Sequence, residues 1–381
     1  MTKAFLLTRQ WQDTADGVQL EFWFSTDQGA LKQLIKHQKA VFFVQQSDMQ
    51  AIQQILPKRF SYDIKNLQLQ TFEQQAVAGV YFKSQSQLYQ ARDLLLQQNI
   101  RCFETDIRPT DRYLTERFIT GPVEIDGNKI LPADYYPALT LLSLDIETGW
   151  NNNQLYAIGF VSKEFNRVLM LGEGINTDTI EYFPDETLLI KAFLQWIQRI
   201  DPDIIIGWNV VQFDFRFLQK KCDQLKIPFR IGREQSQPVW RQAQDETSHY
   251  FLFIAGRVVL DGIDVLKNAT WTFSSYALDN VAHELLGRGK LIHNEETYDT
   301  LYKAKEISRL FQHDKPALAA YNLEDCQLVW EIFEHADLIH FAVERARLTG
   351  LELDRSGGSV AAFENLYLPR PSNSWATLSS A

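Results

Sequence analysis

The sequence has few cysteines, no long apolar segment and a deficit of positive charge. Its 381 residues include three cysteines, Cys102, Cys222 and Cys326, which lie far apart and are odd in number. Such cysteine usage is typical of a reducing compartment rather than of a disulfide framework. No window approaches the roughly 18 consecutive apolar residues that a membrane helix needs. We therefore expect a globular, cytoplasmic protein without a membrane partner.

Several common site motifs are also absent. Gly172 and Gly174 do not complete a dinucleotide-binding fingerprint, and "GRGK" at 287–290 lacks the first glycine of a phosphate-binding loop. The seven histidines show no metal-ligand spacing, and cysteines this far apart offer no zinc site. These absences argue against nucleotide-cofactor chemistry and against zinc chemistry.

The net charge of −10 argues at first against nucleic-acid binding, because affinity for phosphate is usually carried by Lys and Arg. The charge is uneven, however. Residues 1–140 hold 15 basic and 15 acidic side chains, whereas residues 141–381 hold 23 basic and 33 acidic ones. An acidic protein can act on phosphodiesters if its carboxylates hold divalent cations. Ordinary solubilising charge is the alternative explanation for most of these acids.

The first part of the chain predicts a smaller α+β domain over residues 1–137. It is rich in Gln, with strand-like segments at 18–26 and 40–46 and a helical pattern over 84–100. The glycines and prolines of residues 120–137 indicate a connecting segment. With 45% hydrophobic residues overall, the chain can form two or three packed domains.

The second part predicts an α/β domain over residues 138–348. Three strands in a meander, followed by alternating helices and strands, indicate a mixed sheet covered on both faces. From about residue 276 the pattern is mainly helical. Residues 349–381 form a separate tail whose last 13 residues change to Ser, Asn, Thr and Pro without periodicity, for which a frayed terminus is one explanation. The expected elements are a strand at 139–147, a hairpin at 155–162 and 167–172, a helix at 185–200, a strand at 203–208, a helix at 213–225, a strand pair within 249–266 and a long helix at 315–348.

The apolar strand "LLSLDIE" ends in two carboxylates, Asp145 and Glu147. Because side chains two apart on a strand share a face, these acids project together. Two like charges this close repel unless a cation or solvent separates them. A solvated strand end is the alternative for this pair considered alone.

Further acids follow at Asp214 and Asp325. Asp214 opens a predicted helix, where an N-cap role is the alternative. Asp325 and Tyr321 are four residues apart on the apolar stripe of a helix, where an acid is costly unless it is paired or bound to a metal. Four carboxylates are hard ligands suited to Mg²⁺ or Mn²⁺, so the sequence predicts a two-metal site for displacement at phosphorus. Tyr321 is then placed to orient the attacking water.

The motifs "DIE", "NVVQFD" and "YNLED" resemble, in order and spacing, the three exonuclease motifs of family B DNA polymerases, with the bacterial polymerase II branch most similar. The resemblance extends through residues 260–287 and 345–364. It implies an RNase H-like fold and 3′→5′ hydrolysis of single-stranded or frayed-primer DNA ends, as in proofreading.

The resemblance also implies roles for individual residues. Asp145, Glu147 and Asp325 would hold one Mg²⁺ or Mn²⁺ ion, while Asp145 would bridge to a second ion that Asp214 supports partly through water. Asn209 would hydrogen-bond near that second ion.

Thr148 and Phe213 match positions that contact the terminal nucleotide in the family. A core role is the alternative for Phe213. Asp261 and Asp264 either support the site from behind or serve a structural turn.

The chain departs from the family in one respect, since the S-L-Y-P-S and D-T-D signatures of the polymerase palm do not occur in it. By this resemblance residues 349–381 would be the start of the palm and a truncated tail. We therefore expect no nucleotide addition by this chain, and an interrupted reading frame or a fragment as the reason. Contact with a sliding clamp is an expectation for the full-length protein only. Three hypotheses remain: an active DNA exonuclease, a catalytically idle DNA-binding fragment, and a free-standing nuclease acting on RNA.

Overall fold

The computed structural model describes residues 1–243, 249–289, 300–355, 357, 360, 362–363 and 377–378. By its internal contacts the chain forms two compact units. Unit 1 comprises Met1–Ala138, Arg345–Glu352 and Gly358–Ala381, and unit 2 comprises Leu139–Glu344 and Leu353–Gly357. Among the described residues no helix is both long and apolar enough to cross a membrane. The last 13 residues of the chain lie outside the described residues, apart from Thr377–Leu378.

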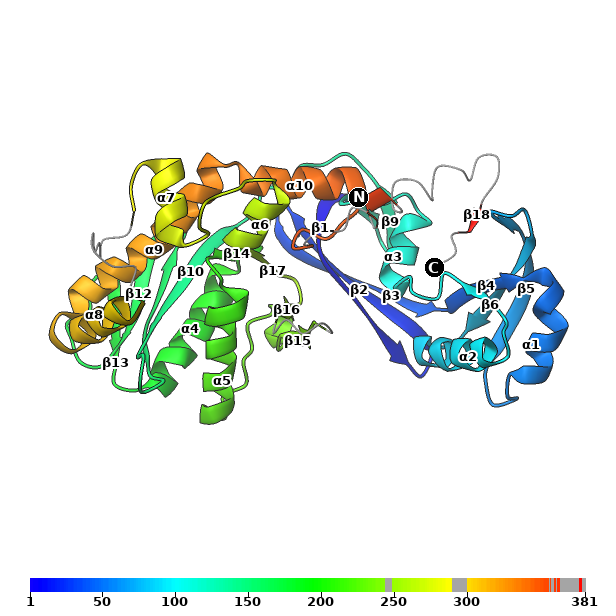
Figure 1. Cartoon of the computed structure of the whole chain (residues 1–381), viewed down its shortest axis with the longest axis horizontal. Coiled ribbons are helices and arrows are strands. Elements are labelled where there is room, and N and C mark those ends of the chain that lie inside the picture. Colours follow the sequence, from blue (N-terminus) through cyan, green and yellow to red (C-terminus); the bar gives the residue numbers. More distant parts are fainter. Residues whose placement is uncertain are drawn as a thin grey trace. The chain divides into compact units, whose positions relative to one another are not determined.

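Unit 1 is built on two five-stranded sheets (Figure 1). Helices α1, α2 and α3 contact these strands, and a shared core of apolar side chains lies between them. The first sheet has the order β3-β2-β1-β8-β9 and the second the order β18-β5-β6-β4-β7. The bounds are β1 Thr2–Thr14, β2 Gly17–Thr26, β3 Gly29–Gln38, β4 Ala40–Gln45, α1 Met49–Ile55, β5 Tyr62–Thr71, β6 Ala76–Phe82, α2 Gln85–Gln97, β7 Cys102–Phe103, α3 Pro109–Thr115, β8 Pro122–Asp126, β9 Lys129–Pro132 and β18 Thr377–Leu378.

An ion-pair cluster fixes the returning segment Arg345–Glu352 within unit 1. Glu352 accepts from Arg108 at 2.8 Å and lies 3.5 Å from the guanidinium of Arg9. Asp111 contacts the same Arg9 guanidinium at 2.9 Å. Two carboxylates thus neutralise two arginines, one of which, Arg9, has a side chain only 4% exposed.

Unit 2 contains a six-stranded mixed sheet of order β13-β12-β11-β10-β14-β17. The neighbours of β11 are antiparallel to it, whereas β14 is parallel to both β10 and β17. The bounds are β10 Leu141–Thr148, β11 Leu155–Val161, β12 Asn166–Leu171, β13 Ile180–Phe183, α4 Glu186–Ile200, β14 Ile204–Gly207, α5 Arg216–Leu225, β15 Val239–Gln242, β16 Tyr250–Phe253, β17 Val258–Asp261, α6 Gly262–Asn268, α7 Leu278–Leu286, α8 Thr300–His313, α9 Lys315–His335 and α10 Leu338–Thr349.

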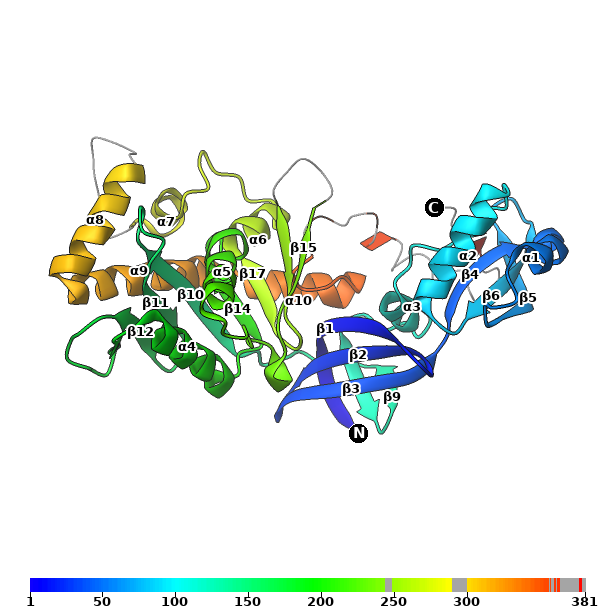
Figure 2. The same ribbon diagram turned by 90° about the horizontal axis from the view of Figure 1, so that it is seen from below.

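Helices cover both faces of the sheet of unit 2, with α4 and α5 on one face and α9 on the other (Figure 2), and strand alternation divides the core into two layers accordingly. On β11, Ile158 and Phe160 pack with residues of α4 and α5, whereas Ala157 packs with residues of α8 and α9. On β10, Leu144 and Ile146 belong to the first layer. Asp145 and Glu147 therefore project toward the face that α9 covers.

The meander of β10, β11 and β12, the helix α4 and the strand β14 agree with the sequence pattern. Four regions differ from it. Residues 120–137 contain the hairpin of β8 and β9, which adds to the sheet of β1 and is therefore more than a connection. Within 249–266, β16 pairs with β15 rather than β17, and "GIDVL" begins α6. The long terminal helix is two helices, since Asp337 adopts a positive φ of 49° between α9 and α10. The short edge strand β13 is not expected from the sequence.

Candidate metal centre and active site

The end of β10 brings three carboxylates together. Ligand oxygens of Asp145, Glu147 and Asp325 all lie within 4.8 Å of one another. Glu147 is 5% exposed and Asp325 is 3% exposed, whereas Asp145 is partly buried, so two of the three carboxylates are shielded from solvent. A buried group of like charges is unfavourable by itself, whereas a divalent cation compensates it. The solvated strand end considered from the sequence is therefore wrong.

Helix α9 supplies Asp325 from the facing layer. Its neighbours on the same stripe, including Leu318, Val329 and Ile332, are buried, as the helical spacing predicts. The helix is fixed to β10 by a hydrogen bond from the Ser143 hydroxyl to the Cys326 carbonyl at 2.8 Å. Tyr321 lies one turn before Asp325, is 4% exposed, and packs in the cluster that contains Ala157.

Asp214 reaches the site from the turn that follows β14. Gly207 ends that strand, and a Cβ there would lie 2.9 Å from the Leu144 carbonyl, so glycine permits the close approach of β14 to β10. Asn209 then adopts a left-handed φ of 57°, which Asn tolerates better than most residues. A π-helical turn, Val211–Phe215, follows and carries Asp214, and such turns are frequent at functional sites.

The Asp214 carboxylate accepts a hydrogen bond from the backbone N–H of Ile146 at 3.0 Å. Asp214 is not an N-cap, since it lies inside the turn and is 2% exposed. Burial, followed by the negative charge of Asp145, raises the pKa of Asp214 well above its usual range. The structure thus brings Asp214 next to the cluster. Asp214 is not one of the three acids whose ligand oxygens lie within 4.8 Å of one another.

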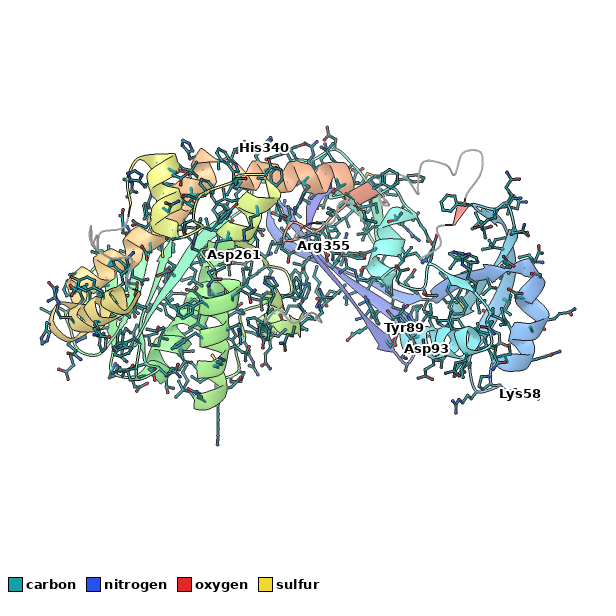
Figure 3. The ribbon with its side chains drawn as sticks, viewed as in Figure 1. Lys58, Tyr89, Asp93, Asp261, His340 and Arg355 are labelled. Atoms are coloured by element: carbon teal, nitrogen blue, oxygen red, sulfur yellow. The ribbon has the colours of Figure 1, made fainter. Side chains whose placement is uncertain are left out.

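Asp261, which is labelled in Figure 3, supports the Asp214 turn from behind. Its carboxylate accepts from the backbone N–H of Asn209 at 3.3 Å and from that of Ile263 at 3.0 Å, the latter as the N-cap of α6. Burial raises its pKa to about 6, with the charge of Asp264 the next contribution. Both roles considered for Asp261, support of the site and a structural cap, therefore apply.

The three residues expected at the DNA contact lie at the end of β10 and in the turn that follows β14. Thr148 ends β10, directly after an irregularity in the pairing with β11. Asn209 is exposed. Phe213 is 46% exposed, and its ring centroid lies 6.3 Å from that of Phe217. The core alternative for Phe213 is thus wrong.

One buried polar residue near the cluster is not among those predicted. Asn322 is fully buried on α9 and donates from Nδ2 to Oδ2 of Asp145 at 2.7 Å. Its position in "YNLED", three residues before Asp325, places it on the inward stripe of the helix. A polar residue on that stripe is the signal that would have found it.

Three family models match the chain. That described as "DNA polymerase II, N-terminal" matches residues 4–39, "DNA polymerase II, insertion domain" matches 40–100, and "DNA polymerase family B, exonuclease domain" matches 92–281. The chain is 41% identical to DNA polymerase II of Escherichia coli over 382 residues, which is 96% of this chain and 48% of that protein. It is 26% identical to a DNA polymerase of Thermococcus kodakarensis over 71% of this chain and 15% of that protein.

Among solved structures, the family B DNA polymerase of Pyrobaculum calidifontis matches with a TM-score of 0.73 and 17% sequence identity. The match covers 99% of this chain and 51% of that one. Together with the match of the exonuclease family to residues 92–281, it supports the expected fold class, an α+β part followed by an RNase H-like α/β exonuclease part with a mixed sheet. This chain spans about half the length of the Escherichia coli relative. On the family models and this identity, the chain belongs to the family B DNA polymerases.

Proposed function

We propose that unit 2 of this chain is a 3′→5′ exonuclease that removes nucleotides from the 3′ ends of DNA, as the proofreading part of a polymerase II-like enzyme. The observation that carries the proposal is the buried cluster of Asp145, Glu147 and Asp325, with Asp214 held beside it. The match of the exonuclease family to residues 92–281 supports it. The substrate is single-stranded DNA or a frayed primer end.

The donor set fits hard divalent cations. Its carboxylate oxygens are the ligands that Mg²⁺ and Mn²⁺ prefer. Burial and the negative charge of Asp145 raise the pKa of Asp214, and a bound divalent cation would lower it by offsetting that charge. Asp145, Glu147 and Asp325 would hold one ion, and Asp145 with Asp214 would hold the second. When bound, two such ions stabilise the attacking and leaving oxygens of an in-line displacement at phosphorus.

The remaining residues position the substrate and water. Tyr321, one helical turn from Asp325, orients the attacking water. Phe213 presents an exposed ring on which a terminal base can stack irrespective of sequence. Thr148 and Asn209, at the ends of β10 and β14, hydrogen-bond to the terminal nucleotide and near the second ion.

The test is Mg²⁺-dependent loss of label from a single-stranded DNA labelled at its 3′ end. The chain should release labelled nucleotide, and the double variant Asp145→Asn with Glu147→Gln should not. Glu324→Gln is the matched control, because Glu324 lies next to Asp325 on α9 but pairs with Arg288. An RNA of the same sequence should be degraded more slowly.

Two results would contradict the proposal. A folded chain that binds the DNA in Mg²⁺ without shortening it would be an idle DNA-binding fragment. Faster degradation of the RNA would instead indicate a nuclease acting on RNA.

A further inference from the structure

The two polar atoms of the buried Asn322 amide differ in their hydrogen bonding. Nδ2 donates to Oδ2 of Asp145 at 2.7 Å. Oδ1 is buried and has no hydrogen-bond partner. An unsatisfied buried carbonyl is unfavourable, because it has lost its hydrogen bonds to water without gaining others. The reverse orientation of the amide would direct a carbonyl oxygen at a carboxylate oxygen, so Asp145 fixes which way the amide points.

Gly159 makes room for this amide. On β11 it is the residue directly opposite Asp145 in the antiparallel pairing. A Cβ at position 159 would lie 2.5 Å from Oδ1 of Asn322 and 2.8 Å from its Cγ. Any side chain at position 159 would displace the Asn322 amide. The glycine on β11 therefore permits the hydrogen bond between Asn322 of α9 and Asp145 of β10.

We infer that Asn322, seated over Gly159, is a positioning residue that fixes the rotation of the Asp145 carboxylate and keeps its other lone pairs directed at the divalent cations. The inference rests on the proposed function, and it assigns a task to a residue that acts through its hydrogen bond to Asp145. Oδ2 of Asp145 accepts the hydrogen bond from the amide, and this bond restricts rotation of the carboxylate about its side-chain torsion. Partners of this kind behind metal ligands affect metal affinity or activity by on the order of 10- to 100-fold.

A purely structural Asn322 would behave differently from a positioning one. Asn322→Leu has a similar shape and removes the unsatisfied carbonyl, which offsets part of the stability lost with the hydrogen bond to Asp145, so the metal-free chain should lose little stability. Asn322→Leu nevertheless removes the donor that orients the Asp145 carboxylate. Metal binding should therefore fall by much more than stability does, which loss of packing alone would not produce.

The experiment measures Mn²⁺ affinity by the electron paramagnetic resonance of free Mn²⁺, without DNA, alongside kcat and KM on a single-stranded oligonucleotide. Asn322→Leu and Gly159→Ala should each weaken Mn²⁺ binding and lower kcat by roughly 10- to 100-fold, with KM for DNA nearly unchanged. The double variant should be no worse than the more affected single variant, because both changes break one contact. Ile158→Val is the control, since it destabilises the core by removing one buried methyl group on the opposite face of β11.

Outcomes for this inference and for the proposed function are separable. Unchanged Mn²⁺ affinity in Asn322→Leu, or no Mn²⁺ binding by the original chain, overturns the inference. An original chain that binds Mn²⁺ but degrades no DNA contradicts the proposed exonuclease, while the Mn²⁺ affinities of the variants still decide the role of Asn322. Additive losses in the double variant would also overturn it, since Gly159 and Asn322 would then act separately.

Discussion

The Asp261 carboxylate holds two backbone amides while its own charge is poorly solvated. Its pKa rises to about 6 in the folded chain from an ordinary value of 3.8. The folded state therefore binds this proton more tightly than the unfolded state does. The stabilisation it contributes is fully present below pH 4 and is lost as the pH rises to about 6.

We expect Asp261→Asn to remove this pH dependence. Asn remains a good N-cap and can still accept from the amides of Asn209 and Ile263. In a chelator-containing buffer, the unfolding free energy of the original chain should fall by roughly 3 kcal/mol more than that of the variant between pH 4 and pH 7. Urea denaturation at a series of pH values measures this difference. Parallel pH curves for the two proteins would refute it.

Phe213 allows a second test at the residue scale. Because its ring is 46% exposed, Phe213→Ala should change the unfolding free energy by no more than about 0.5 kcal/mol. If a base stacks on this ring, the variant should bind single-stranded DNA about 5- to 100-fold more weakly. Fluorescence anisotropy with a labelled oligonucleotide, in a chain that also carries Asp145→Asn, measures binding without degradation. Phe217→Ala, which alters a partly buried neighbour, serves as the comparison.

The sequence predicts some site residues better than others, for physical reasons. Strand alternation is enough to place Asp145 and Glu147 on one face, and helical spacing is enough for Asp325. Helical spacing could also have placed Asn322 on the inward stripe, but its hydrogen bond is to Asp145, 177 positions earlier in the chain. No local pattern encodes that contact or the space that Gly159 leaves for it, so the inferred role of Asn322 follows from the structure and not from the sequence.

At the scale of elements, two buried arginines hold the start of β14 and β17. Arg257 is 1% exposed and pairs with Asp201 at 2.8 Å, and it also donates to the carbonyls of Ile231 and Pro202. Arg233 pairs with Asp201 and with the buried Asp203. Burial lowers the pKa of Arg257 to about 10, so its charge is retained at neutral pH at a cost in desolvation.

We expect Arg257→Ala to destabilise unit 2 by about 3–5 kcal/mol, because it leaves carbonyls and part of Asp201 without their buried partner. Arg199→Ala, which removes an exposed guanidinium stacked on Trp196, should cost less than about 1 kcal/mol. Guanidinium chloride unfolding monitored by circular dichroism compares the two. Equal losses of unfolding free energy in the two variants would show that the buried ion pairs and hydrogen bonds of Arg257 do not contribute more to stability than the exposed Arg199 does.

The misassigned elements share one cause, which is that tertiary context overrides local pattern. The Gly and Pro residues of 120–137 do mark turns, but β8 pairs with β1 more than 100 residues away. Apolar periodicity continues across Ala336 and Asp337, and only the positive φ of Asp337 separates α9 from α10. The short strand β13 is half-buried along its whole length, so it shows no alternation.

At the scale of the whole molecule, the chain consists of two units, and within the part of the chain that the structure describes the carboxylate cluster lies in unit 2. Calorimetry of the metal-free chain should therefore resolve two unfolding transitions. Mn²⁺ at about 100 times its dissociation constant should stabilise unit 2 by about 2.7 kcal/mol and move one transition only. In Asp145→Asn that shift should shrink. Movement of both transitions would place a Mn²⁺ site in unit 1 as well.

The path of the chain through unit 1 has a consequence for synthesis. Ribosomes produce roughly 5–20 residues per second, so Glu352 follows residue 138 by roughly 10–40 s. During that interval Arg9 and Arg108 have Asp111 without the second carboxylate that completes their cluster. The amino-terminal part of unit 1 is therefore translated before unit 2. Its ion-pair cluster is completed only after unit 2 has been synthesised, when Glu352 becomes available.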